Sequence, residues 1–224
     1  MKIWHIGDTH SSHKDLKVPE GIDMVIFSGD CSNPRNPYNN EPEVRDFLTW
    51  YDSLPIKYKV FVAGNHDSSI EFGLVDKETF SNLNIVYLEN DYTIIEGIKI
   101  YGSPLTPTFG DWAFMKSRSK ISKYWDNIPE DSDIIVTHGP PKGILDLSHS
   151  FTGVLEECGC SALRKKVAKI NPKFMLFGHI HDTRLISNAG TRVANGQDTI
   201  FSNGSCVTDG KGYKLTSNGN ILNY

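Results

Sequence analysis

The sequence predicts a layered α/β domain, in which β-sheets pack against helices. Two observations lead to this prediction. Short apolar runs recur along the chain, and each ends directly in a polar loop that contains glycine or leads into one. Stretches with apolar residues at helical spacing lie between some of these runs, which indicates amphipathic helices. A mixture of strands and helices in alternation is typical of α/β architectures.

Five apolar runs are predicted to be strands buried on both faces, because they are short and are bounded by turn residues. These runs are residues 2–6, 24–27, 60–63, 134–136 and 174–177. Two later segments predict additional strands. Residues 92–102 read as a pair of strands that turn at Gly97, and residues 199–215 read as further strand rich in turns.

Two segments are predicted to be helices, since their apolar residues fall on one stripe at helical spacing. They are residues 41–54, which stop at Pro55, and residues 161–170. The stripe consists of Val44, Phe47, Leu48, Tyr51 and Leu54 in the first helix, and of Leu163, Val167 and Ile170 in the second.

Length and composition predict a single domain over residues 1–224. The 224 residues, of which 38% are hydrophobic, suffice for one sizeable core, and neither a linker nor a repeat divides them. The net charge of −4 argues against a broad basic surface for nucleic acid. No apolar stretch approaches the roughly 20 residues that a membrane span requires. We therefore expect a cytoplasmic protein whose four cysteines stay reduced.

The polar loops after the five apolar runs predict one shared site, because such loops converge beyond the carboxyl ends of the strands. Their carboxylate, amide and imidazole groups suit two divalent ions of Mn, Fe or Zn. In extended chain, side chains two residues apart point the same way, so Asp8 with His10, and His179 with His181, should face one cluster. The expected metal ligands are Asp8, His10, Asp30, Asn65, His138, His179 and His181. If Asp30 bridges both ions, each ion receives four of them.

Such a cluster is typical of phosphoester hydrolysis, since two ions lower the pKa of a shared water and stabilise the phosphoryl oxygens. We expect the bridging hydroxide to attack, so that no covalent intermediate forms. His66, which is not needed as a ligand, is the expected general acid for the leaving group. Asp67 is expected to orient or charge His66.

Five motif blocks resemble, in order, those of the calcineurin-like metallophosphoesterase superfamily. They are Gly7-Asp8-Thr9-His10, Gly29-Asp30, Gly64-Asn65-His66-Asp67, Thr137-His138-Gly139 and Gly178-His179-Ile180-His181. The resemblance implies a sandwich of two mixed β-sheets flanked by helices, with layers in the order α/β/β/α. It also implies that Asp8, His10, Asp30 and His181 bind one metal, that Asp30, Asn65, His138 and His179 bind the other, and that His66 lies beside the scissile bond.

A narrower resemblance is to the branch called metallophosphoesterase-domain-containing proteins, which is associated with nucleotide and cyclic-nucleotide phosphoester hydrolysis. The residues that carry it are Gly102-Ser103-Pro104, Trp112-Ala113-Phe114, His138-Gly139-Pro140-Pro141, Gly143-Ile144-Leu145-Asp146, Gly159-Cys160, Leu163 and Asn203-Gly204-Ser205-Cys206. The expected function is a phosphodiesterase or phosphatase of small nucleotides. The alternatives are a metal-dependent nuclease, which the acidic charge disfavours, and a nucleotide-binding protein with little turnover.

Substrate contacts are expected from Asn65 and His66, with His13 and Trp112 as further candidates. Trp112 belongs to an aromatic cluster with Phe109 and Phe114, which would either stack on a base or pack in the core.

Other polar groups have two readings each. Arg118, Lys142 and Arg184 are expected to be solvated, with a second phosphate as the alternative. Cys31 would either pack inertly or make the site sensitive to oxidation, and Cys158-Gly159-Cys160 is expected to be a reduced loop that leads into a helix. His5 and His149 lie outside the motif blocks and are not expected to bind metal.

Overall fold

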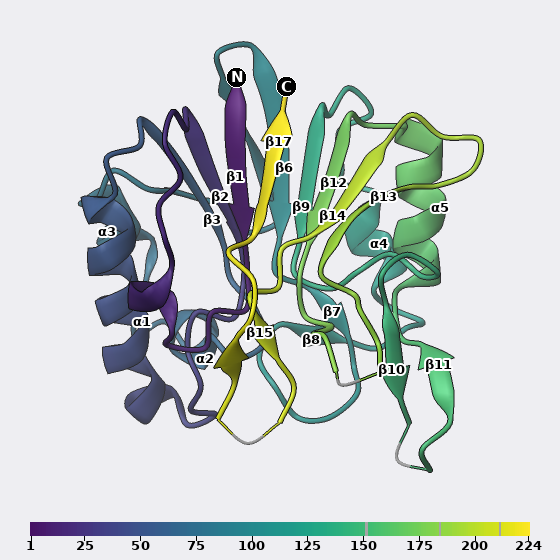
Figure 1. Cartoon of the computed structure of the whole chain (residues 1–224), viewed down its shortest axis with the longest axis horizontal. Coiled ribbons are helices and arrows are strands. Elements are labelled where there is room, and N and C mark those ends of the chain that lie inside the picture. The colour runs from purple at the N-terminus through teal and green to yellow at the C-terminus, as the bar shows by residue number, and fades with distance from the viewer. Residues whose placement is uncertain (151, 184, 211) are drawn as a thin grey trace.

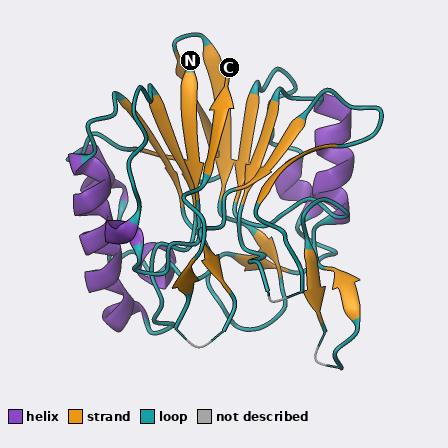
Figure 2. Cartoon of the chain, viewed as in Figure 1, coloured by secondary structure: helices purple, strands orange, loops and turns teal. Residues whose placement is uncertain are grey.

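Two β-sheets pack face to face and helices cover their outer faces, as Figure 1 and Figure 2 show. The computed structural model describes residues 1–150, 152–183, 185–210 and 212–224. Helix α1 covers the first sheet, and α4 and α5 cover the second (Figure 1). This arrangement confirms the expected α/β/β/α sandwich.

The first sheet has the strand order β17-β1-β2-β3-β4. Its strands β1 to β4 are parallel, and β17 pairs antiparallel with β1 at the edge. The bounds are β1 (Lys2–Ile6), β2 (Met24–Ser28), β3 (Tyr58–Val62), β4 (Val86–Tyr87) and β17 (Asn220–Asn223). The three runs predicted here are strands, with bounds that differ from the prediction by at most two residues.

The second sheet has the strand order β13-β14-β12-β9-β6-β5. Its four central strands are parallel, whereas β5 and β13 run antiparallel at the two edges. The bounds are β5 (Asp91–Ile95), β6 (Ile98–Ser103), β9 (Ile134–Thr137), β12 (Phe174–Phe177), β13 (Gly190–Val193) and β14 (Ile200–Asn203). The predicted strand pair with its turn at Gly97 is therefore confirmed as β5 and β6.

Three small strand pairs lie beyond the ends of the two sheets. They are β7 (Thr106–Pro107) with β8 (Met115–Lys116), β10 (Leu147–His149) with β11 (Leu155–Glu157), and β15 (Val207–Thr208) with β16 (Lys214–Leu215). The helical segments are the 3-10 helix η1 (His13–Asp15), α1 (Pro37–Ser53), α2 (Ser68–Glu71), α3 (Lys77–Ser81), α4 (Ser122–Trp125) and α5 (Ser161–Ile170). In the described residues, no helix combines the length and the apolar character that crossing a membrane demands.

Helix α5 has the predicted bounds, whereas α1 begins four residues earlier than predicted. The cause lies at its first turn. The side chain of Asn36 accepts hydrogen bonds from the backbone N–H groups of Tyr38 and Asn39, and Pro37 occupies the first helical position. This cap satisfies backbone groups that a helix start leaves without partners, so the helix extends back to Pro37.

The core has a middle layer between the sheets and an outer layer under each set of helices. Aliphatic side chains such as Val60, Ile100 and Val136 fill the middle layer. Under α1 the outer layer is aromatic, with ring centroids of Phe27 and Phe47 4.4 Å apart. Both faces of the five strands β1, β2, β3, β9 and β12 are thus buried, as the unbroken apolar runs predict.

The middle layer changes from aliphatic to polar toward the carboxyl ends of the parallel strands. His5 is fully buried there and contacts the hydroxyl groups of Ser202 at 2.8 Å and Ser28 at 3.1 Å. Because Ser28 belongs to the first sheet and Ser202 to the second, this imidazole connects the sheets. Gly204 packs against the ring, where an added Cβ would come within 2.7 Å of it.

Burial lowers the pKa of His5 to about 3, whereas the unfolded chain has a value near 6.5. Below pH 6.5 the unfolded chain therefore takes up a proton that the folded chain excludes, and stability falls as the pH drops. We predict that replacing His5 with Gln flattens this dependence by about 1 kcal/mol per pH unit between pH 6 and pH 4. Urea unfolding across this range measures the slope. The exposed His149→Gln is the control, and an equal slope in His5→Gln and wild type would contradict the prediction.

Candidate metal centre

The polar loops that follow β1, β2, β3, β9 and β12 meet at one end of the sandwich, below the sheets in Figure 1. Backbone hydrogen bonds join them directly. Asp8 N donates to Gly29 O at 2.8 Å, and Gly178 N donates to His138 O at 3.0 Å. Residues that are far apart in the sequence therefore share one site.

The side chains in these loops form overlapping groups with ligand atoms within 4.8 Å of one another. One group is Asp8, His10 and His181, and a second is Asp30, His138 and His179. A third group, His10, Asp30 and His66, shares His10 with the first group and Asp30 with the second. Asn65 reaches the second group, since its Oδ1 lies 2.9 Å from His138 Nε2. The fold thus brings together all seven side chains that the sequence predicts as ligands.

The backbone reaches this convergence through left-handed turns and not through the extended chain that we expected. Positive φ angles occur at Asp8 (46°), His10 (42°), Asp30 (61°) and His179 (71°). The expected reason for the pairing of Asp8 with His10 and of His179 with His181 is therefore wrong, although their side chains do meet. Such angles are uncommon outside glycine and cost energy, and they concentrate at functional sites.

Two glycines allow the loops to approach this closely. A Cβ added at Gly178 would lie 2.1 Å from Asp8 Oδ2, and one added at Gly64 would lie 2.3 Å from Asp30 Oδ1. Any side chain at either position would displace a carboxylate of the cluster. The absence of a side chain at these two glycines therefore leaves room for the carboxylates of Asp8 and Asp30.

Hydrogen bonds to backbone carbonyls determine which imidazole nitrogens face the cluster. His10 Nδ1 lies 3.1 Å from Ser32 O, and His138 Nδ1 lies 2.8 Å from Ser28 O, so each Nδ1 carries the proton and donates. The Nε2 lone pairs of both rings then point inward. His10 Nε2 is buried and has no hydrogen-bond partner among the described residues.

When the imidazoles are neutral, as metal binding requires, the inward-facing atoms are acceptors without a donor between them. His138 Nε2 lies 2.9 Å from Asn65 Oδ1 and 3.2 Å from Asp30 Oδ2, and His10 Nε2 lies 3.9 Å from the same Asp30 oxygen. Converging lone pairs repel one another unless a cation or a proton lies between them. The donor set of carboxylate, amide and imidazole therefore fits divalent metal ions.

Charge balance supports the same interpretation. Burial disfavours the ionised form of Asp30, but the neighbouring His138 and His66 outweigh this and hold its pKa well below the usual value. The carboxylate of Asp30 is thus ionised, and it is available to a cation.

Comparisons with known proteins agree with this geometry. The sequence model of the family described as calcineurin-like phosphoesterase matches residues 1–183. This chain belongs to the calcineurin-like phosphoesterase family. It is 33% identical to human metallophosphoesterase domain-containing protein 1 over 91% of its own length, and it spans 65% of that protein. It is also 31% identical to a UPF0046 protein of Caenorhabditis elegans, with 90% of this chain and 74% of that protein covered.

The fold is similar to that of a solved hydrolase. The crystal structure of phosphopantetheinyl hydrolase from Mycobacterium tuberculosis superposes with a TM-score of 0.60, covering 91% of this chain and 88% of that chain. The sequence identity is 14%, so the likeness concerns the fold alone.

In this calcineurin-like chain, His66 lies beside the metal centre and is held from two sides. Its Nδ1 lies 3.0 Å from Asn33 O, and its backbone N–H donates to Asp30 Oδ1 at 2.7 Å. The ring of Trp112 packs over His66 with centroids 4.3 Å apart. Because Nδ1 lies beside the carbonyl of Asn33, it carries a proton. The ring of His66 also lines the adjacent cavity.

The expected role of Asp67 is wrong, because its carboxylate binds the loop after β2 and not the ring of His66. It accepts hydrogen bonds from the backbone N–H groups of Asp30 at 3.0 Å, Cys31 at 3.0 Å and Gly64 at 2.8 Å. Ser32 Oγ donates to it at 2.8 Å as well. Asp67 thus holds the backbone that carries Asp30, while the carbonyl of Asn33 orients His66.

The expectation that His13 contacts substrate is also wrong. His13 is 1% exposed and lies 3.3 Å from Asp46, away from the cavity. Its ring packs against Phe47 and Trp50 of α1. The short helix η1 turns this histidine toward α1 because its aromatic neighbours offer apolar contact there.

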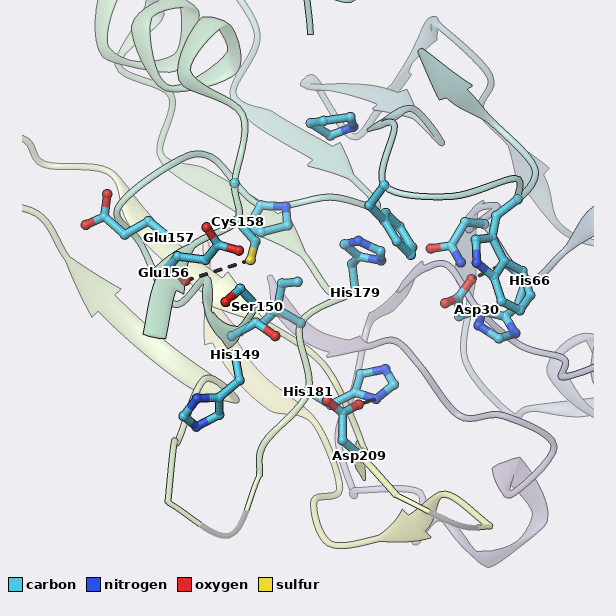
Figure 3. A pocket seen from close by; sticks show the side chains of 18 of the residues that line it. Asp30, His66, His149, Ser150, Glu156, Glu157, Cys158, His179, His181 and Asp209 are labelled. Carbon is cyan, nitrogen blue, oxygen red and sulfur yellow. Dashed lines mark hydrogen bonds and ion pairs between the residues drawn. The ribbon is translucent and has the colours of Figure 1, made fainter. Parts of the chain in front are cut away.

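A cavity of about 670 Å³ opens over the metal centre. Trp112 and Phe109 contribute to its lining, whereas Phe114 packs in the core, which was one of the two readings of the aromatic cluster. The opposite side comes from β10, β11 and the loop after β11, as Figure 3 shows. Its residues are Ser148, His149, Ser150, Glu156, Glu157, Cys158 and Gly159.

The motifs of the narrower resemblance build this side of the cavity. The buried carboxylate of Asp146 accepts hydrogen bonds from Gly143 N and Gly159 N, both at 2.9 Å. The guanidinium of Arg118 donates to the carbonyls of Cys158 and Gly159 at 2.7 and 2.9 Å. Arg118 therefore lines the cavity but is engaged with the backbone. Lys142 is exposed, and Arg184 lies outside the described residues.

The four cysteines are free thiols, which agrees with the expected reduced state. Cys31 is fully buried and its Sγ lies 3.1 Å from Asp67 Oδ1. Burial and this carboxylate raise the pKa of the Cys31 thiol well above its usual value, so the thiol is inert. Cys160 precedes α5, as expected for a loop that leads into a helix.

Sequence reasoning missed two residues that contact predicted ligands. Asp209 lies 2.8 Å from His181, and the ring of Tyr213 stacks on His10 with centroids 3.8 Å apart. Both residues follow the fifth motif block, which ends at His181, and they belong to none of the motifs identified in the sequence. The sequence therefore contains no signal for them.

We predict that Asp67→Asn lowers the free energy of unfolding by about 1–3 kcal/mol, because one amide oxygen cannot replace two carboxylate oxygens as acceptors for buried N–H groups. It should also weaken metal binding through Asp30. Urea unfolding and metal analysis by mass spectrometry measure the two effects. Asp131→Asn, which removes an exposed ion pair with Lys99, is the control and should change little. Unchanged stability of Asp67→Asn would contradict the structural role.

Proposed function

We propose that this chain is a metal-dependent phosphoesterase that hydrolyses mono- or diester bonds of small substrates, with nucleotides and cyclic nucleotides as the expected class. The observation that carries the proposal is the convergence of seven side chains with oxygen and nitrogen ligand atoms, among which the buried Nε2 of His10 has no hydrogen-bond partner in the described residues. Membership of the calcineurin-like phosphoesterase family supports it. The proposal treats residues 1–224 as one domain in a cytoplasmic protein, which rests on the sequence alone.

Asp30 is the proposed bridging ligand. Its Oδ2 lies between His10 Nε2 at 3.9 Å and His138 Nε2 at 3.2 Å, while its Oδ1 accepts from the backbone of His66. One ion would be held by Asp8, His10, Asp30 and His181, and the other by Asp30, Asn65, His138 and His179. Bound divalent ions at these positions would activate water and neutralise charge on the phosphoryl oxygens.

His66 is the proposed general acid for the leaving oxygen. Its Nδ1 proton is engaged by the carbonyl of Asn33, so a proton on Nε2 is the one that the ring can donate into the cavity. Packing against Trp112 limits rotation of the ring. An acid held in a defined orientation beside the leaving group typically contributes a factor of about 10²–10⁴ to the rate.

The shape and charge of the cavity favour small substrates over polymers. A volume of about 670 Å³ is typical of pockets for small molecules. Phe109 is 54% exposed and its ring lies 5.2 Å from that of His179, so it offers a surface on which a base can stack. Glu156, Glu157 and Asp209 line the same cavity and would repel a polyanionic strand.

The first test is hydrolysis by the purified chain loaded with manganese. We predict release of nitrophenol from bis-p-nitrophenyl phosphate, and turnover of at least one member of a panel of linear and cyclic nucleotides. Asp30→Asn should abolish turnover and weaken both metals, because the proposed bridge loses its charge. Glu156→Gln, a change on the same cavity but outside the ligand set, is the control.

Two outcomes of this test favour the alternatives. Metal binding without turnover on the panel would overturn the enzyme and favour a protein that sequesters nucleotides. Cleavage of long DNA or RNA in preference to nucleotides, with a steep dependence on salt, would favour a nuclease.

The second test separates His66 from the ligands. We predict that His66→Ala lowers kcat about 100-fold or more, while metal content measured by mass spectrometry stays at the wild-type level. Loss of metal in this variant would show that His66 is a ligand and not the general acid. Trp112→Phe, which keeps an aromatic ring over His66, is the matched control and should retain most of the activity.

A further inference from the structure

The segment between β15 and β16 reaches the metal centre although it lies beyond residues 1–183, which the family model matches. Its two strands pair antiparallel. The segment is tied to the loop after His181, since Asp209 N donates to Asp182 O at 3.0 Å and Thr208 forms a bridge with Asp182. The segment between β15 and β16 thus lies beside the last motif block.

Asp209 contacts the outer nitrogen of a proposed ligand. Its Oδ1 lies 2.8 Å from His181 Nδ1 (Figure 3). The other nitrogen of that ring, Nε2, lies 3.1 Å from Asp8 Oδ1. The contact is an ion pair and not an aligned hydrogen bond, and a carboxylate this close to Nδ1 favours a proton on that nitrogen. The Nε2 lone pair is then directed toward Asp8 and His10, where the first ion would lie.

Tyr213, on the same segment, contacts a second proposed ligand of that ion. Its ring stacks on His10 with an interplanar angle of 6° and centroids 3.8 Å apart, and it meets the edge of His181 at 5.7 Å. The stack covers one face of His10 and limits its rotation. Two residues of one segment therefore hold the two imidazoles of one ligand group.

Among the described residues, Asp209 and Tyr213 make no hydrogen bond, ion pair or ring contact with His138 or His179 of the other ligand group. His138 Nδ1 donates to the backbone carbonyl of Ser28, which no side-chain substitution removes. A change at Asp209 should therefore act on the group of Asp8, His10 and His181 and leave the group of Asp30, His138 and His179 in place. This difference makes the role of Asp209 measurable at one ion.

We propose that Asp209 is a positioning residue for the ion bound by Asp8, His10 and His181, and that Tyr213 supports the same ion through His10. The inference rests on the proposed function, since it assumes two metal sites. Carboxylates that hold the outer nitrogen of a metal-binding histidine typically contribute about 10- to 100-fold in metal affinity. The binding affinity of one site is thus expected to depend on the segment between β15 and β16.

The experiment is manganese binding to the full chain, measured by titration calorimetry and by metal analysis after equilibrium dialysis. We expect two ions in wild type. Asp209→Ala should keep one at wild-type affinity and weaken the other by about 10- to 100-fold. The affinity of this site in Asp209→Asn should fall between those of wild type and Asp209→Ala, because the amide keeps an oxygen beside Nδ1 but removes the charge. Glu156→Gln, which lines the same cavity, should bind both ions as wild type does.

A second pair of variants tests Tyr213. Tyr213→Phe keeps the stacked ring and should bind both ions normally, whereas Tyr213→Ala should weaken the same site as Asp209→Ala. If Asp209→Ala does not fold, as judged by circular dichroism, the nearly isosteric Asp209→Asn and Tyr213→Ala carry the test.

The outcomes separate this inference from the proposed function. Two ions in wild type with unchanged affinities in the Asp209 and Tyr213 variants would overturn the inference alone. Fewer than two ions in wild type would overturn the two-metal centre and the inference with it. Equal weakening of both ions in Asp209→Ala would overturn the assignment of Asp209 to a single site.

Discussion

Where the two sheets end, the buried carboxylate of Asp30 faces His138 from the second sheet and His10 from the first, at 3.2 and 3.9 Å. Groups from both sheets therefore depend on the position of one side chain. That position is set by the backbone, because Asp30 N, Cys31 N and Gly64 N all donate to the carboxylate of Asp67. A buried acid without these donors would lose the hydrogen bonds that offset its burial.

Hydrogen bonds between the two sheets also stabilise the strained backbone of the site. Asp8, His10, Asp30 and His179 have left-handed backbone angles, which residues other than glycine rarely adopt. Hydrogen bonds from His179 N to both oxygens of Asp8, at 2.9 Å, connect two of these turns across the sheets. These two turns are therefore stabilised by partners that are distant in the sequence. The loops reach this arrangement only when both sheets are in place.

The middle layer of the core continues this polar arrangement inward. His5 binds Ser28 and Ser202 directly behind the metal centre, and Gly204 provides the space for its ring. On the other side, Asp146 and Arg118 hold the loop after β11, which forms part of the cavity. Residues outside the proposed ligand set thus maintain the surroundings in which the ligands meet.

The sequence by itself determined the α/β class, the five strands that precede the polar loops and the seven side chains that meet beyond them. These features arise from local patterns, since a short apolar run before a glycine-containing loop specifies a buried strand and its exit at the sheet edge. Only the tertiary structure decided where individual side chains point. Asp67 turns to the loop after β2 and His13 turns to α1. Asp209 and Tyr213 reach His181 and His10 from the segment between β15 and β16. Each of these contacts forms with a residue that is distant in the sequence, so it depends on how the folded chain places that residue. Local sequence patterns do not specify such long-range positions.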